Sequence, residues 1–327
     1  MKPHVVVIGS ANTDLVVRVP KLPSPGETVT GRQFQIVAGG KGANQAVAAA
    51  RAGARVAFIG SLGPDNFGKA ILRGLRREGI DTRYVVRSED SPSGVALIMV
   101  DARGENLIGV ARGSNDELLP KHIDAAASFI DSARCLVVQL EIPLATVRHA
   151  LKLAVLHNVP VLLNPAPARR VPATLLRQIT FLTPNEGELG ALTGLPVKGK
   201  SAVEAATQRL HNLGVKHVLA TCGARGVCWR SAVGARWYSA PRVRAVDTVG
   251  AGDCFSGAFA AAMTEGKTVE EAVRFAIAAA AISVTRPGAQ TAMPRRREIL
   301  RSLAACWPGA GLLFLLPFAH CLCKQTV

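Results

Sequence analysis

The chain has 327 residues, 49% of them hydrophobic and 19% charged, a balance that excludes a disordered chain and indicates a buried core. Its formal net charge of +16 is dispersed, without aromatic interleaving or zinc-finger spacing, which favours a solvated surface that attracts anionic substrates over a nucleic-acid-binding surface. The 7 cysteines have no regular spacing, which excludes a disulfide framework and a paired zinc motif.

A buried strand is expected first, over residues 5–8, and it stops at the turn Gly9-Ser10. This apolar run is too short for the core of a signal peptide. We therefore expect a cytoplasmic, reduced protein.

A group of β segments broken by proline, glycine and charged turns comes next and continues later in the chain. These segments are expected at residues 15–19, 28–37, 94–100 and 106–111. We expect them to form a small sheet apart from the main one, a lid whose strands lie within residues 12–37 and 94–111. The lid would have exposed edges and one apolar face, and pairing the lids of two subunits would cover both, which predicts a homodimer.

From Lys41 onward, strand-like and helix-like segments alternate as in βαβ units, which favours a parallel sheet. The expected strands lie at residues 55–60, 135–139, 160–163, 181–183 and 217–221. The expected helices lie at residues 42–51, 66–78, 144–157, 202–213, 251–264 and 269–285. The predicted fold class is α/β, a three-layer α/β/α sandwich with a mostly parallel central sheet and the small β-sheet lid.

The end of the chain changes character, so we expect one domain over residues 1–303 and an appended tail of unknown structure over residues 304–327. The apolar run at residues 312–319 is shorter than the ~20 residues that a membrane span needs, and Pro317 interrupts it. The sequence therefore predicts no membrane span.

The segment at residues 247–258, Asp-Thr-Val-Gly-Ala-Gly-Asp-Cys-Phe-Ser-Gly-Ala, is the most informative one. Its small residues allow a tight turn, and the helix that begins there would direct free N–H groups at an anion. Asp253, in the first helical turn, could accept a proton from a substrate hydroxyl. The same carboxylate could instead only stabilise the helix N-terminus, and this segment alone does not decide between the two.

A second glycine-rich turn, Gly39-Gly40-Lys41-Gly42, runs into an alanine-rich helix. It is not the phosphate loop Gly-x4-Gly-Lys-Ser/Thr, because both the spacing and the terminal hydroxyl are absent. Taken alone, such a turn is ordinary helix punctuation more often than a site.

Together, these two segments resemble the two signature regions of the ribokinase and phosphofructokinase-B family of carbohydrate kinases. The resemblance extends over residues 4–300. Further stretches match in the same order, at residues 9–14, 25–31, 164–168, 183–188 and 285–290. So many matches in one order make the resemblance specific.

The resemblance implies a role for each matching residue at the reacting centre. Asp253 corresponds to the catalytic base, and the anion hole corresponds to Gly250, Ala251 and Gly252. The sugar would be bound by Asn12, Asp14, Gly40, Lys41, Asn44, Glu141 and Asp253. These types suit sugar hydroxyls, because Asp accepts hydrogen bonds and Asn both donates and accepts them.

The resemblance also implies sites for the nucleotide and for two cations. ATP would lie against Asn185, Thr221, Gly223, Gly226 and Gly252. Glu188 would hold Mg²⁺ through water, because Mg²⁺ keeps much of its hydration shell. A monovalent cation, K⁺, would be held by Asp247 and the carbonyls of Val249, Ser283, Arg286 and Gly288. One departure is Ala292, where these kinases commonly carry Ser, and the lost oxygen would weaken cation binding.

The implied reaction is the ATP-dependent phosphorylation of D-ribose at O5 to give ribose 5-phosphate. Related sugars and nucleosides, namely deoxyribose, fructose and adenosine, remain alternatives, and Asn12 favours ribose because a polar partner suits its 2-hydroxyl. A non-catalytic sugar-binding regulatory protein is a further alternative, which the retention of Asp253 argues against. The expected partners are the sugar and ATP, with neither nucleic acid nor membrane.

Overall fold

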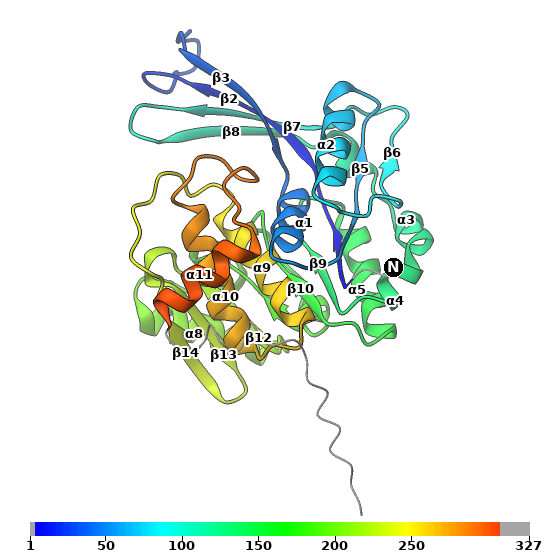
Figure 1. The fold of residues 1–327 in the computed structure, drawn as a ribbon, viewed down its shortest axis with the longest axis vertical. Coiled ribbons are helices and arrows are strands. Elements are labelled where there is room, and N and C mark those ends of the chain that lie inside the picture. Colours follow the sequence, from blue (N-terminus) through cyan, green and yellow to red (C-terminus); the bar gives the residue numbers. More distant parts are fainter. Residues whose placement is uncertain (1–3, 308–327) are drawn as a thin grey trace, which may run out of the picture.

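An eight-stranded sheet forms the centre of the protein, with the strand order β14-β13-β12-β11-β10-β9-β1-β4. The structure, a computed structural model, describes residues 4–307 (Figure 1). The strands from β12 to β4 pair in parallel, and β13 and β14 add an antiparallel hairpin at one edge. Their bounds are β1 Val5–Ile8, β4 Val56–Ile59, β9 Cys135–Val138, β10 Val161–Leu163, β11 Phe181–Leu182, β12 His217–Thr221, β13 Val227–Ser231 and β14 Gly234–Tyr238.

The strand β1 shows why this sheet is covered on both faces. All its residues are buried, and they are all β-branched and apolar. Val5 and Val7 belong to one core cluster, whereas Val6 and Ile8 belong to the other, as the alternation of side chains along a strand requires. Two cores, one on each face of the sheet, confirm the predicted three-layer sandwich.

Helices supply the other side of each core. One face is covered by α1 (Lys41–Arg51), α2 (Asn66–Arg77), α9 (Ala251–Thr264), α10 (Val269–Ser283) and α11 (Arg296–Cys306). The other is covered by α3 (Pro120–Ala125), α4 (Ala127–Asp131), α5 (Leu144–Leu156), α6 (Ala173–Leu176), α7 (Glu186–Thr193) and α8 (Lys200–Asn212). Helices α1 and α9 pack so closely that a Cβ at Gly257 would lie 2.4 Å from the backbone oxygen of Gln45.

A second sheet stands above the body in Figure 1 and forms the lid. Its strand order is β3-β2-β7-β8, with the bounds β2 Asn12–Arg18, β3 Gln33–Gly39, β7 Gly94–Val100 and β8 Asn106–Ala111. Strands β2 and β7 pair in parallel, and the outer pairs are antiparallel. A short pair, β5 (Ser61–Leu62) and β6 (Val86–Arg87), lies apart from it.

The lid strands differ from the expected ranges in an informative way. Strand β2 begins at Asn12 instead of residue 15, and β3 runs to Gly39, two residues beyond 37. The polar residues Asn12 and Asp14 carry no apolar signal, yet Asn12 pairs with Gly39 on one side and Gly94 on the other. Backbone pairing therefore extends the lid into the residues that the resemblance assigns to sugar binding.

The last described helix, α11, runs past Leu303, the expected end of the domain. Leu303 is fully buried, and Trp307 packs against the same core cluster. None of the helices in residues 4–307 has both the length and the apolar composition of a membrane span. The apolar run at residues 312–319 lies outside the described residues.

Two truncations should separate the end of the domain from the tail. Ending the chain after Trp307 is expected to leave activity and the melting temperature close to those of the full chain, because every proposed site residue lies earlier. Ending it after Leu303 removes the last turn of α11 and the contact of Trp307, which should lower the melting temperature by a few degrees. Loss of solubility when the chain ends after Trp307 would instead make residues 308–327 part of the core.

Candidate active site

The carboxyl ends of β1 and β9 lie where the strand order changes direction, the place where open α/β sheets bind ligands. Ser10 follows β1 and donates its hydroxyl hydrogen to Glu141, which follows β9. The backbone N–H of Lys41, the first residue of α1, donates to the same carboxylate at 3.0 Å. Glu141 therefore joins three segments that are far apart in the sequence.

Gly40 determines how α1 begins and how close it lies to the lid. Its φ is 84°, and a Cβ there would lie 2.6 Å from the Cα of Ala11 and the backbone nitrogen of Asn12. Only glycine fits such a position. The glycine-rich turn thus lies directly against Ala11 and the lid residue Asn12.

Asn12 is held by a residue that the sequence analysis missed. Asn115, in a short 3₁₀ helix at Gly113–Glu117, donates from Nδ2 to Asn12 Oδ1 at 2.8 Å. Asn115 Oδ1 in turn accepts from the backbone N–H of Ala11 at 2.9 Å. This bond uses the side-chain oxygen of Asn12 as an acceptor, so the NH₂ group is the part of this side chain that can still donate. The only signal in the sequence was a polar turn directly after a lid strand.

Asp253 lies in the first turn of α9 and is 6% exposed. Its two carboxylate oxygens accept from Asn44 Nδ2 at 3.0 Å and from Gln45 Nε2 at 2.9 Å. Gly250, with a φ of 73°, is the N-cap, and the first bond back to it comes from Cys254. The N–H groups of Gly252 and Asp253 precede this bond, so they are open to an anion. The space around Gly252 is clear, because an added Cβ would meet no atom within 4 Å.

Charges of opposite sign converge on Lys41. Burial acts to lower its pKa, but the carboxylates of Asp253, Glu141, Glu188 and Asp14 outweigh this and raise it, so Lys41 stays cationic. Burial, followed by the charges of Glu141 and Asp253, raises the pKa of Asp14 to about 6. Burial likewise raises the pKa of Glu188. The proposed sugar, base and magnesium residues therefore lie within electrostatic reach of one another.

The residues expected to bind the nucleotide lie at the ends of β11 and β12. Asn185 caps α7, where Glu188 accepts from both its backbone N–H and its side chain at 2.9 Å. Asn185 also forms a parallel bridge with Thr221, the last residue of β12. Gly226 has a φ of 91°, and a Cβ there would lie 1.9 Å from the backbone oxygen of Tyr238, so a glycine is required in this turn. Gly223 begins the same turn. Strands β10 and β11 lie between this turn and the end of β9.

The residues expected to hold a monovalent cation lie in two segments, one just before α9 and one at and after the end of α10. Asp247 accepts from the backbone N–H of Val249 at 2.9 Å and from that of Gly288 at 2.8 Å. The carbonyl of Ser283 accepts from the N–H of Arg286 at 3.1 Å. The carboxylate of Asp247 therefore joins the two segments through hydrogen bonds to Val249 and Gly288.

Comparisons with known proteins identify the family of the chain. The pfkB family carbohydrate kinase model matches residues 2–296. A ribokinase of Haemophilus influenzae is 43% identical over 93% of this chain and 99% of its own, and a deoxyribokinase of Salmonella typhi is 40% identical over 89% and 95%. The structure of Arabidopsis thaliana ribokinase complexed with ribose and ATP has a TM-score of 0.87 at 38% identity, covering 93% of this chain and 99% of that one. The chain belongs to the pfkB family of carbohydrate kinases.

Proposed function

We propose that this enzyme transfers the γ-phosphate of ATP to O5 of D-ribose to give ribose 5-phosphate. The observation that carries the proposal is the placement of Asp253. This buried carboxylate lies at the start of α9, bonded to Asn44 and within electrostatic reach of Asp14, Lys41 and Glu141. The residues proposed as the base, the anion-binding helix end and part of the sugar site thus lie close together, which supports the proposal.

Each group has a defined task in this reaction. The lid residues Asn12 and Asp14 and the α1 residues Lys41 and Asn44 orient the sugar, so that its primary hydroxyl faces Asp253. Asp253 accepts the hydroxyl proton as O5 attacks the γ-phosphorus in line. The open N–H groups at the start of α9 stabilise the charge on the transferring phosphoryl group.

Mg²⁺ would neutralise charge on the ATP phosphates. Within residues 4–307, no cluster of at least three His, Cys, Asp or Glu side chains is placed to hold a metal ion. Both carboxylate oxygens of Glu188 accept hydrogen bonds from Asn185. This donor set fits an ion held by phosphates and water, with Glu188 contacting it through water.

A panel of acceptors tests the proposed reaction directly. ADP release from ATP and Mg²⁺ should be highest with ribose among ribose, deoxyribose, fructose and adenosine. A preference for deoxyribose would leave the assignment as a sugar kinase intact and would change the proposed substrate. Absence of turnover with all four would favour the non-catalytic alternative.

K⁺ is the proposed activating cation, and Ala292 should limit its effect. Ala292 is fully buried in the loop that contains Gly288. Its methyl group supplies no oxygen, whereas the hydroxyl of a serine would. Ala292→Ser is expected to raise the ratio of activity in K⁺ to that in Na⁺ by a few-fold, with Thr291→Ala as the control, since that hydroxyl donates to Pro287. An unchanged ratio in Ala292→Ser would contradict the role of this position.

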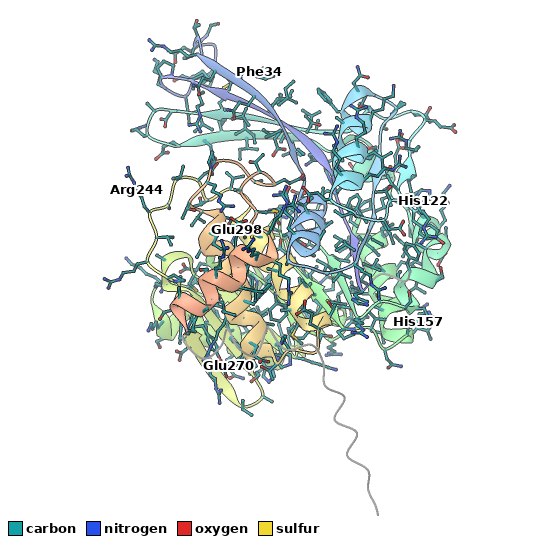
Figure 2. The ribbon with its side chains drawn as sticks, viewed as in Figure 1. Phe34, His122, His157, Arg244, Glu270 and Glu298 are labelled. Atoms are coloured by element: carbon teal, nitrogen blue, oxygen red, sulfur yellow. The ribbon has the colours of Figure 1, made fainter. Side chains whose placement is uncertain are left out.

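We propose a homodimer that pairs lids. Strand register places large apolar side chains on the lid face opposite Asp14, and Figure 2 labels Phe34 there, far from the body. They are between 36% and 59% exposed, and they are Phe34, Ile36, Leu97, Met99 and Leu107. A contiguous apolar face of this kind marks an association surface. Because ATP is held inside cells, we expect this dimer to work in the cytoplasm.

A charge on the apolar lid face should separate the dimer. Leu97→Glu would bury a carboxylate between two lids, so sedimentation should show a monomer where the unmodified enzyme sediments as a dimer. Arg103→Glu, in the exposed β7–β8 turn, is the control and should leave the dimer intact. A dimer that survives Leu97→Glu would place the interface elsewhere.

A further inference from the structure

A chain of buried side-chain amides runs from the central sheet to Asp253. Gln139, Asn164 and Thr183 are each the first residue after a strand, and their strands β9, β10 and β11 are neighbours in the sheet. Gln45, on α1, lies between them and Asp253 and is fully buried. Burying a glutamine is costly unless its amide is fully bonded.

The bonds of this chain have a fixed direction. The backbone carbonyl of Thr183 can only accept, so Asn164 donates to it from Nδ2, at 2.9 Å. Asn164 Oδ1 must then accept, and it does so from Gln45 Nε2 at 3.1 Å. The oxygen of Gln45 accepts from Gln139 Nε2 at 2.6 Å. Rotating the Gln45 amide by half a turn would place its oxygen against Asn164 Oδ1 and its nitrogen against Gln139 Nε2. The NH₂ group of Gln45 therefore faces Asp253.

The second oxygen of Asp253 also accepts a hydrogen bond from a side-chain amide that is itself hydrogen-bonded. Gln290 Nε2 donates to Asn44 Oδ1 at 3.1 Å, which turns Asn44 Nδ2 toward Asp253 Oδ2. Both oxygens of Asp253 thus face N–H donors whose direction is set by residues beyond them. A carboxyl group that meets a donor at each oxygen is stabilised as the carboxylate.

The unbonded oxygen of Gln139 supports a functional reason for this chain. Within the described part of the protein, Gln139 Oε1 is buried and has no hydrogen-bond partner. A leucine or methionine at this position would avoid that cost. Only the nitrogen of this amide is used, and it gives the buried oxygen of Gln45 a donor.

We propose that Gln45, oriented by Asn164, is a positioning residue that holds Asp253 as the ionised carboxylate and fixes its orientation toward the acceptor hydroxyl. The inference rests on the proposed role of Asp253 as the base. Burial raises the pKa of Asp253, and Lys41, Asn44 and Gln45 act against this. The other charged groups that face Asp253 are the carboxylates of Glu141, Asp14 and Glu188.

Gln45→Met, which keeps the length of the side chain and removes its amide, tests the inference. The rate of phosphoryl transfer in a single turnover, measured against pH, should have its acid limb moved upward by about one to two pH units, the scale of a lost bond to a charged group. Activity should return toward that of the unmodified enzyme at high pH. A variant that is uniformly slow, with an unmoved acid limb, would overturn the inference.

Gln139→Met is the matched control, because it leaves the Gln45 amide in place. It leaves the buried oxygen of Gln45 without a donor, which should outweigh the removal of the unbonded Gln139 oxygen and lower the melting temperature. The acid limb should move by less than in Gln45→Met. Equal shifts in the two variants would overturn the assignment to Gln45. If Gln45→Met does not fold, isotope-edited infrared spectra of the unmodified enzyme and Asp253→Asn decide the matter, since Asp253 must show a carboxylate band at neutral pH.

Failure of this inference can be told apart from failure of the proposed function. Normal turnover in Asp253→Asn would remove the base itself. If Asp253→Asn is inactive and the acid limb of Gln45→Met is unmoved, the assignment of Asp253 as the base stands and only the role of Gln45 is rejected.

Discussion

Asp253→Asn is expected to lower turnover by ~10²-fold or more while ribose binding is retained, because the substitution removes the general base and little volume. An asparagine offers one acceptor oxygen where the carboxylate offers two, so either Asn44 or Gln45 would face its NH₂ group. We therefore also expect a lower melting temperature. Turnover is measured from ADP release at saturating ribose and ATP, and binding by calorimetry.

A capping aspartate serves as the control for this substitution. Asp65 accepts from Gly68 at the start of α2, far from the reacting centre in the sequence, and Asp65→Asn should reduce stability with near-normal turnover. If Asp253→Asn also turns over at a near-normal rate, Asp253 only stabilises the helix N-terminus.

Ribose is expected to exceed deoxyribose by roughly ten- to a hundredfold in kcat/KM. The NH₂ group of Asn12, whose oxygen is occupied by Asn115, would lose its partner when the 2-hydroxyl is missing. An unpaired buried donor costs about 1–3 kcal/mol, and about 1.4 kcal/mol corresponds to a factor of ten. Asn12→Leu should shrink the ratio, mainly by reducing the use of ribose.

Thr13→Val is the control on the same strand, because successive residues of β2 point to opposite faces of the lid. It should leave the ratio of the two sugars unchanged. Equal use of both sugars by the unmodified enzyme would show that the 2-hydroxyl is not recognised, and the assignment would then be a sugar kinase of unknown preference.

The sequence predicted those parts of the fold whose signal is local. Helix α9 was expected at residues 251–264, its observed range, because small residues and a glycine turn mark its start. The hairpin β13–β14 was missed, since Val227–Ser231 and Gly234–Tyr238 mix arginine, tryptophan and cysteine without a clear period. Strand β13 is defined by pairing with β12, and β14 by pairing with β13, which a single sequence does not show.

Site residues were predictable when they stood in a recognisable motif. Lys41 and Asn44 follow the glycine turn, and Asp253 follows the next one. Asn115 stands in no such motif, and it meets Asn12 across 103 positions of the chain. Gln45 stood inside a recognised motif without an assigned role, because its bond to Asp253 spans 208 positions.

The separation of the lid from the body has a consequence for enzyme engineering. Two of the proposed sugar-binding residues, Asn12 and Asp14, lie on the lid strand β2, whereas the proposed base and the open N–H groups belong to α9. A combinatorial library restricted to β2 and its neighbour β7 would vary acceptor preference on an unaltered phosphoryl-transfer centre. The same library on α1 would be restricted, because Gly257 leaves no room for larger side chains beside Gln45 and Ala48.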